Sequence, residues 1–116
     1  MNLLKETKED IAASGHKPTD IVFIGSAESG HCCTWEEFEV LADNDYNCGC
    51  GAQEVATDLV IVFKDGTNMW REEYDGSEGW SYSAPIKIPE KTYTIKSLFV
   101  TPEQVGWETL GEINKE

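Results

Sequence analysis

Five side chains that could bind a metal lie in two short segments of this chain. All four cysteines are there, and a histidine directly precedes the first pair. Thiolates and imidazoles are the preferred ligands of structural zinc, which needs four of them in a tetrahedron. Fourteen residues separate the two segments, so their loops could meet at one ion across an intervening helix. The sequence therefore predicts a structural zinc site made by four of the residues His31, Cys32, Cys33, Cys48 and Cys50.

Other interpretations of the cysteines stay open. The spacing differs from the familiar Cys-x-x-Cys knuckle, and the adjacent Cys32 and Cys33 should point in different directions. Free cysteines are common as small buried residues, so the thiols could be unconnected. Disulfides are a third possibility, although they rarely persist in a reducing compartment. If zinc is bound, both a cysteine-only set and three cysteines with His31 would satisfy a tetrahedron.

Two arrangements have the components of catalytic sites. His31 beside Cys32 pairs an imidazole with a thiol, but the side chains of sequence neighbours diverge and the acidic surroundings disfavour a thiolate. Carboxylates and tryptophans between positions 70 and 80 are the groups that a sugar-cleaving site uses. Alternation along a strand, however, places Glu72 and Glu73 on opposite faces. We therefore expect that the protein is not an enzyme.

The charge of the chain is strongly negative and concentrated in its middle. There are 22 acidic residues against nine basic ones, which gives a net charge of −13. Between Glu28 and Glu78 lie thirteen of the acids and only two bases, Lys64 and Arg71. Direct binding to nucleic acid or to an anionic membrane is not expected, because the lysines and arginines that neutralise phosphates are missing. The charge predicts a basic protein partner.

The pattern of apolar residues and turn signals predicts an α+β domain. Thr34 and Glu37 form a capping box that begins a helix extending to about Asp43. The apolar run 57–64 is a central strand, and Asp65–Gly66 is a hairpin turn. We expect an antiparallel meander of three or four strands with helices packed on one face and zinc-stabilised loops. The remaining expected elements are helices at 2–14 and from Thr101 onward, and strands at 20–25, 68–74, 80–84 (at an edge) and 92–100.

Length and termini favour one soluble domain spanning residues 1–116. The first eight residues carry charges where a secretion signal needs an apolar stretch, and no run is long enough to cross a bilayer. These features predict a cytoplasmic protein.

Three segments of the middle of the chain resemble a small domain found in phages and prophages. They are Trp35-Glu-Glu-Phe38, Ala56-Thr-Asp-Leu-Val-Ile-Val62 and Trp70-Arg-Glu-Glu-Tyr-Asp-Gly-Ser-Glu-Gly-Trp80. In size and acidity the chain is also similar to the type II anti-CRISPR proteins, which are phage inhibitors of RNA-guided nucleases. The Cys32–Cys33 and Cys48-Gly-Cys50 pairs resemble a zinc-binding member of that class. The resemblance implies an inhibitor that binds the nuclease in the cytoplasm of the phage's host.

Such a nuclease holds its guide–target heteroduplex in a positively charged channel, where an acidic surface could block the loading of target DNA. We expect the outer face of the central helix and the acidic hairpin to bind the partner, with a tryptophan as the apolar anchor. These partner-binding residues are Glu36, Glu39, Asp43, Glu72, Glu73, Asp75, Glu78 and Trp80. The alternative is a zinc-stabilised acidic adaptor that binds a host protein.

Overall fold

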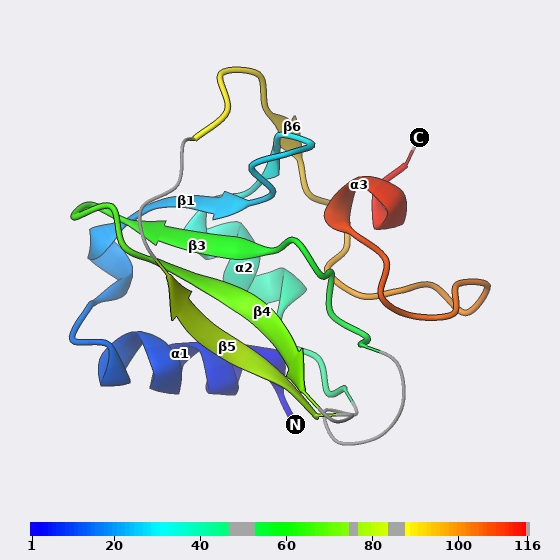
Figure 1. Cartoon of the computed structure of the whole chain (residues 1–116), viewed down its shortest axis with the longest axis horizontal. Coiled ribbons are helices and arrows are strands. Elements are labelled where there is room, and N and C mark those ends of the chain that lie inside the picture. The colour runs from blue at the N-terminus through cyan, green and yellow to red at the C-terminus, as the bar shows by residue number, and fades with distance from the viewer. Residues whose placement is uncertain (47–52, 75–76, 84–87, 116) are drawn as a thin grey trace.

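The computed structural model describes residues 1–46, 53–74, 77–83 and 88–115. One sheet and three helices make up the regular structure (Figure 1). The helices are α1 (Leu3–Ala13), α2 (Trp35–Leu41) and α3 (Leu110–Ile113), with a short 3-10 turn at Pro18–Asp20. The strands are β1 (Ile21–Gly25), β2 (His31–Cys32), β3 (Val60–Phe63), β4 (Asn68–Tyr74), β5 (Ser77–Ser83) and β6 (Tyr93–Thr94). The α+β class is therefore confirmed.

The sheet is larger than predicted and is mixed rather than purely antiparallel. Its six strands lie in the order β5-β4-β3-β1-β2-β6. The antiparallel succession β3-β4-β5 is the expected meander, and β5 lies at an edge as predicted. The expected strand at 92–100 is reduced to two residues, which pair in parallel with β2 at the opposite edge. The parallel pair arises because the chain crosses from one edge of the sheet to the other after β5.

The core lies on one face of the sheet and is shared by all three helices. Ile24, Ile61 and Met69 are cross-strand neighbours on that face and are fully buried. The helices cover them with buried apolar side chains, among them Leu3, Ile11, Phe38, Leu110 and Ile113. No helix of the described residues is long and apolar enough to cross a membrane.

Capping explains where the helices begin. The predicted box at Thr34 is confirmed, since Thr34 N donates to Glu37 Oε1 (2.8 Å) and Glu37 N donates to Thr34 Oγ1 (3.1 Å). The predicted C-terminal helix starting at Thr101 is wrong. Residues 101–104 form only a turn, and α3 begins after a second capping box at Thr109. Gly106 (φ 110°) and Trp107 (φ 66°) have positive φ angles that no α-helix accommodates.

Candidate functional site

The first half of the predicted metal site directly follows the tight turn between β1 and β2, and His31 and Cys32 form β2. Ser26 is buried, and its Oγ accepts hydrogen bonds from the backbone N–H groups of Glu28 (3.2 Å) and Ser29 (3.1 Å). Gly30 closes the turn with φ 80°, a conformation that favours glycine. The turn therefore fixes where His31 and Cys32 enter the sheet.

Two glycines allow the strands to approach β2 unusually closely. A Cβ atom on Gly25 would lie 1.9 Å from the carbonyl oxygen of His31, and one on Gly30 would lie 2.1 Å from that of Lys91. The close approach between Gly30 and Lys91 allows Tyr93 N to donate a hydrogen bond to Gly30 O (2.6 Å). This hydrogen bond begins the pairing of β6 with β2. The backbone around His31 and Cys32 is thus held from both sides.

The side chains of this segment are in different environments. His31 Nδ1 lies 2.9 Å from Ser29 Oγ, and its ring centroid is 5.3 Å from that of Tyr93. Cys33 packs against the core instead. Burial, together with the negative charge of Glu37 and the neighbouring Cys32, raises the pKa of Cys33 to about 12. The thiol of Cys33 is therefore protonated at neutral pH, which does not suit a nucleophile.

The zinc site stays a prediction. Within the described residues, no three His, Cys, Asp or Glu side chains come together as a metal-binding group. Cys48 and Cys50 lie outside the described residues, so the second half of the predicted ligand set has no described geometry.

Two of the three carboxylates predicted on the outer face of α2 contact other side chains. Glu36 is exposed at the start of the helix. Glu39 lies 3.7 Å from the Nζ atom of Lys8, and both side chains are about half exposed. Asp43 is exposed and accepts a hydrogen bond from Asn2 Nδ2 (3.0 Å). All three carboxylates therefore remain accessible, although two of them have partners.

The predicted acidic hairpin separates into an outer and an inner set. Glu72 is exposed and accepts a hydrogen bond from Ser81 Oγ (2.9 Å), and Glu73 is half-buried. Asp75 lies outside the described residues. The side chain of Glu78, however, is only 2% exposed. It accepts hydrogen bonds from the backbone N–H groups of Glu54 (2.7 Å) and Val55 (3.2 Å), so it does not belong to the exposed acidic surface.

Trp80 also faces the interior rather than solvent. It is half-buried and packs against the core, and its Nε1 donates to Thr7 Oγ1 on α1 (3.0 Å). Two residues further on, Tyr82 donates its hydroxyl hydrogen to the carbonyl oxygen of Asp10 (2.6 Å). Alternation along β5 thus directs Glu78, Trp80 and Tyr82 toward the same side, where α1 lies.

A fully buried arginine organises this inner set. The guanidinium of Arg71 pairs with Glu6 (3.2 Å) and Glu78 (3.0 Å), and it donates to the Tyr46 hydroxyl oxygen (2.9 Å). It also lies 4.9 Å from the centroid of the Trp80 ring, a distance typical of a cation–π contact. Burial alone would lower the pKa of Arg71, but its acidic and hydroxyl partners raise it above the ordinary value. The arginine is therefore charged and compensated.

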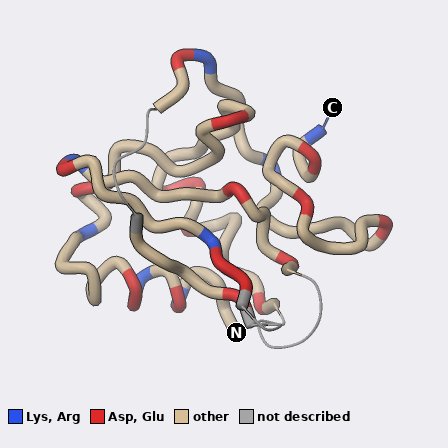
Figure 2. The backbone as a smooth tube through the Cα atoms, viewed as in Figure 1, with Lys and Arg blue, Asp and Glu red and all other residues tan. Residues whose placement is uncertain are grey.

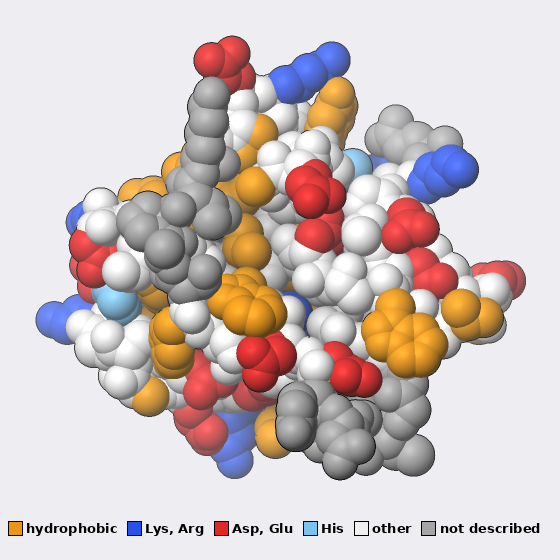
Figure 3. Space-filling view, viewed as in Figure 1, with side chains coloured by type: hydrophobic (Ala, Val, Ile, Leu, Met, Phe, Trp, Pro, Cys, Tyr) orange, Lys and Arg blue, Asp and Glu red, His pale blue; other side chains and the backbone are white. Residues whose placement is uncertain are grey.

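The contact between Tyr46 and Arg71 brings two acidic segments to one end of the molecule. Asp45 directly precedes Tyr46 and forms an isolated antiparallel β-bridge with Asn2. The side chain of Asn2 also donates a hydrogen bond to Asp43. On the other side of the contact, Glu72 and Glu73 follow Arg71 on β4. Figure 2 shows these acidic segments of the backbone close to the N terminus, and Figure 3 shows acidic side chains on that part of the surface. We refer to Asp43, Asp45, Glu72 and Glu73 as the acidic end.

A second polar cluster joins the end of α1 to the β3–β4 turn. His16 stacks on Phe63 with ring centroids 3.9 Å apart, and its Nε2 lies 2.9 Å from Asp65 Oδ2. Its Nδ1 lies 2.9 Å from Ser14 Oγ. The three residue types are those of a catalytic triad, but Ser14 donates its hydroxyl hydrogen to Ile11 O (2.7 Å) and not to the imidazole. The cluster has the hydrogen bonds of a helix end rather than those of an activated serine.

Sequence reasoning missed the Arg71 cluster, although one signal points to it. In β5 the small residues Gly79, Ser81 and Ser83 alternate with the large Glu78, Trp80 and Tyr82. A strand with all its large side chains on one face packs that face against another element. The position of that element depends on long-range folding, so Glu6 and Thr7 of α1 could not be identified as partners.

No protein-family model, curated protein or solved structure matches this chain.

Proposed function

We propose that this protein is a phage-encoded inhibitor that binds an RNA-guided type II nuclease through its acidic end and blocks the loading of target DNA. The observation that carries the proposal is the Tyr46–Arg71 contact. It draws the 43–46 and 71–74 segments together and buries the positive charge of Arg71. The exposed carboxylates of Asp43, Asp45 and Glu72, together with the half-buried Glu73, are left at this end of the molecule.

The magnitude of the charge supports an electrostatic competition with DNA. The molecule measures 36 × 31 × 25 Å. Over 36 Å of length, duplex DNA carries about 21 charges at one per 1.7 Å. A net charge of −13 is therefore about 60% of that of a DNA segment of equal length, enough to compete for a channel lined with lysine and arginine.

The test is the inhibition of target binding by a purified type II nuclease loaded with its guide RNA. The triple variant Asp43→Lys, Glu72→Lys, Glu73→Lys should weaken inhibition by at least about tenfold, because like charges then face the channel. The matched control is Glu9→Lys, Glu90→Lys, Glu103→Lys, which changes the net charge equally at exposed positions elsewhere. Raising the salt concentration should weaken inhibition by the wild-type protein and by the control variant to the same extent.

Two results would contradict the proposal. If the protein binds the nuclease at high salt and leaves its affinity for target DNA unchanged, it does not block the channel. Such binding would instead support the adaptor hypothesis. Full inhibition by the acidic-end variant would show that the inhibitory surface lies elsewhere.

The cysteines have a structural role in this proposal. Zinc bound by Cys32, Cys33, Cys48 and Cys50, or by three of these with His31, would hold together the two loops that flank α2. Purified protein never exposed to chelator should then contain about one equivalent of zinc, and chelation should loosen the domain. Cys48→Ser with Cys50→Ser should abolish metal binding. Absence of zinc from the wild-type protein would overturn this part of the proposal alone.

A further inference from the structure

The loop that precedes α3 carries two exposed apolar side chains, Val105 and Trp107. Val105 is 82% exposed, the highest value among the large hydrophobic residues that the structure describes, and Trp107 is 54% exposed. The other three tryptophans, Trp35, Trp70 and Trp80, are half-buried. Figure 3 shows hydrophobic side chains side by side at the right of the molecule, where Figure 1 places this loop. The loop therefore presents an apolar surface that includes the most exposed tryptophan.

The backbone of this loop has an unfavourable conformation at Trp107. Its φ angle of 66° lies in the left-handed region, where the Cβ atom of a residue other than glycine is crowded by a carbonyl oxygen. The preceding residue is Gly106 with φ 110°, a conformation that glycine accepts readily. Strained backbone persists only where surrounding contacts enforce it, and such positions cluster at functional sites. The conformation of Trp107 therefore points to a functional constraint on the loop.

Hydrogen bonds enforce this conformation on both sides of the indole. Trp107 N donates to the carbonyl oxygen of Gln53 (2.8 Å). Gly106 N donates to Glu108 Oε1 (2.8 Å), and the carbonyl oxygen of Glu108 accepts a hydrogen bond from Thr57 N (3.0 Å). Residues 106–108 are thus attached to the segment that leads into β3.

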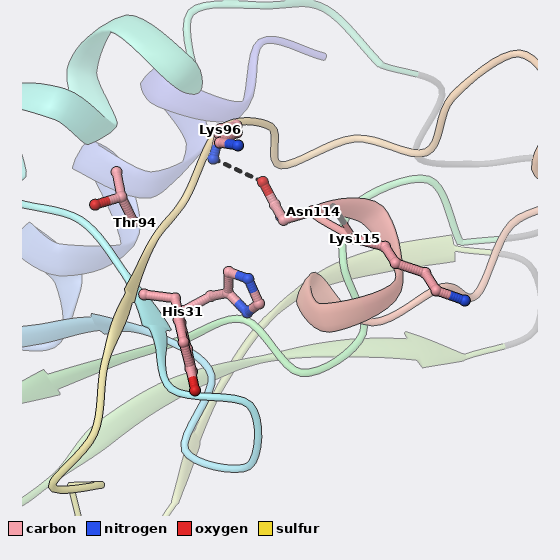
Figure 4. A pocket seen from close by; sticks show the side chains of 6 residues that line it. His31, Thr94, Lys96, Asn114 and Lys115 are labelled. Carbon is pink, nitrogen blue, oxygen red and sulfur yellow. Dashed lines mark hydrogen bonds between the residues drawn. The ribbon is translucent and has the colours of Figure 1, made fainter.

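The helix that follows the loop is also fixed in place. The buried Asn114 at the end of α3 accepts hydrogen bonds at its Oδ1 from the N–H groups of Lys96 (2.6 Å) and Ser97 (2.8 Å). Figure 4 shows the side chain of Asn114 reaching from α3 to Lys96. Because the loop is held at both of its ends, the indole loses little conformational freedom when it binds a partner.

A short series of contacts connects this loop to the acidic end. Gln53, whose carbonyl oxygen binds Trp107 N, is followed by Glu54. The backbone N–H of Glu54 donates to Glu78 Oε2 (2.7 Å), and Glu78 pairs across the β4–β5 hairpin with Glu73 of the acidic end. Figure 3 shows acidic side chains of the hairpin and hydrophobic side chains of the loop on the same face. The apolar and acidic surfaces can therefore contact one partner together.

The charges near the loop indicate what kind of partner it fits. From residue 101 to the end of the chain there are four acidic residues and one basic residue, Lys115. A second copy of this chain, with its own net charge of −13, would be repelled. Lysine and arginine side chains, by contrast, are attracted both to these carboxylates and to the face of an indole ring. The loop therefore suits an apolar pocket that is bordered by basic residues.

We propose that Val105 and Trp107 are the apolar anchor of the partner interface and insert into a pocket of the nuclease that is bordered by lysine or arginine. This inference rests on the proposed function and adds to it. Trp107 takes the role that Trp80 cannot fill, because Trp80 packs against α1. Tryptophan is enriched among the residues that dominate the binding energy of interfaces. The acidic end then supplies the salt-dependent part of the affinity, and the anchor supplies the part that persists in salt.

The test measures the affinity for a type II nuclease loaded with its guide RNA, at low and at high salt. The anchor variant is Val105→Ser with Trp107→Asn, since asparagine adopts a positive φ angle more readily than other residues. Its affinity should fall at least about thirtyfold. The loss should be the same at both salt concentrations, because apolar contacts are not screened. The acidic-end variant, in contrast, should lose affinity mainly at low salt.

The matched control is Val22→Ser with Tyr93→Asn. It removes two apolar side chains that are 49% and 45% exposed elsewhere, and it should change the affinity less than about twofold. Urea denaturation checks that each variant is folded. If the anchor variant is not, Val105→Asn alone decides the question, because Val105 is exposed in the free protein and its affinity should still fall at least about fivefold.

The outcomes separate this inference from the proposed function. Wild-type affinity in the folded anchor variant, or in Val105→Asn, would overturn the anchor and leave the inhibitor function standing. A loss of affinity that disappears at high salt would also overturn it, because the loop would then act through charge. Absence of any binding between the wild-type protein and the nuclease would overturn both.

Discussion

The two edges of the sheet are built in contrasting ways. At one edge, β4 and β5 pair over seven residues, and the inner side chains of β5 contact α1. At the other edge, β2 and β6 have two residues each, and two close glycine contacts hold them. The first edge thus depends on buried side chains and the second on backbone geometry.

The two edges also differ in whether their positively charged side chains are buried or exposed. At the β4–β5 edge, Arg71 is fully buried and its charge is compensated by Glu6 and Glu78. At the β2–β6 edge, Lys96 and Lys115 are exposed and line an open pocket. Removing one partner of a buried ion pair is strongly destabilising because it leaves an uncompensated buried charge, whereas exposed charges contribute little to stability. Substitutions at the two edges should therefore have different effects.

The largest effect should follow from Arg71→Ala. It leaves the carboxylates of Glu6 and Glu78 buried without a positive partner, which costs about 3–5 kcal/mol of unfolding free energy. Urea denaturation measures the loss. Lys64→Ala, an exposed lysine after β3, is the control and should change stability by less than about 0.5 kcal/mol. A loss below about 1 kcal/mol for Arg71→Ala would show that the cluster is not a structural centre.

Gly30→Ala should have the next largest effect, at the other edge. The added Cβ would lie 2.1 Å from Lys91 O, and φ is 80°. Gly15→Ala is a matched control, since φ there is 83° but no atom lies within 4 Å of the added Cβ. The control should lose about 1 kcal/mol from backbone strain alone, and Gly30→Ala about 2–4 kcal/mol. Equal losses in the two variants would show that the close approach to Lys91 is unimportant.

Local signals in the sequence predicted the elements well. The capping box at Thr34, the apolar run that contains β3, and the Asp65–Gly66 turn act over a few residues, and each is found in the structure. The parallel β2–β6 pair was missed because it joins segments 60 residues apart without a local signal. The C-terminal helix was misplaced because Thr101 and Gln104 satisfy a turn as well as a helix cap.

The predicted site residues show the same limit. Composition identified an acidic protein, and the exposed Glu36, Asp43 and Glu72 agree with that expectation. Burial is decided by tertiary packing, so sequence alone could not separate the exposed Glu72 from the buried Glu78. The prediction that Trp80 is an exposed anchor fails for the same reason, since Trp80 lies against Arg71 and Thr7.

The smallest effect should come from the exposed contact between the β3–β4 turn and the end of α1. The hydroxyl group of Thr67, followed by His16, lowers the pKa of Asp65 from 3.8 to about 2. A lowered pKa in the folded state means that the ionised carboxylate stabilises the fold above about pH 4 and that this contribution is lost as the pH falls toward 2. Asp65→Asn should therefore lower the urea midpoint at pH 5 and have a much smaller effect near pH 2. Because the side chain of Asp65 is exposed, added salt should shrink the difference in urea midpoint at pH 5, whereas the loss of stability in Arg71→Ala should persist in salt. A difference between Asp65→Asn and wild type that is as large at pH 2 as at pH 5 would show that the side chain acts through packing and not through its charge.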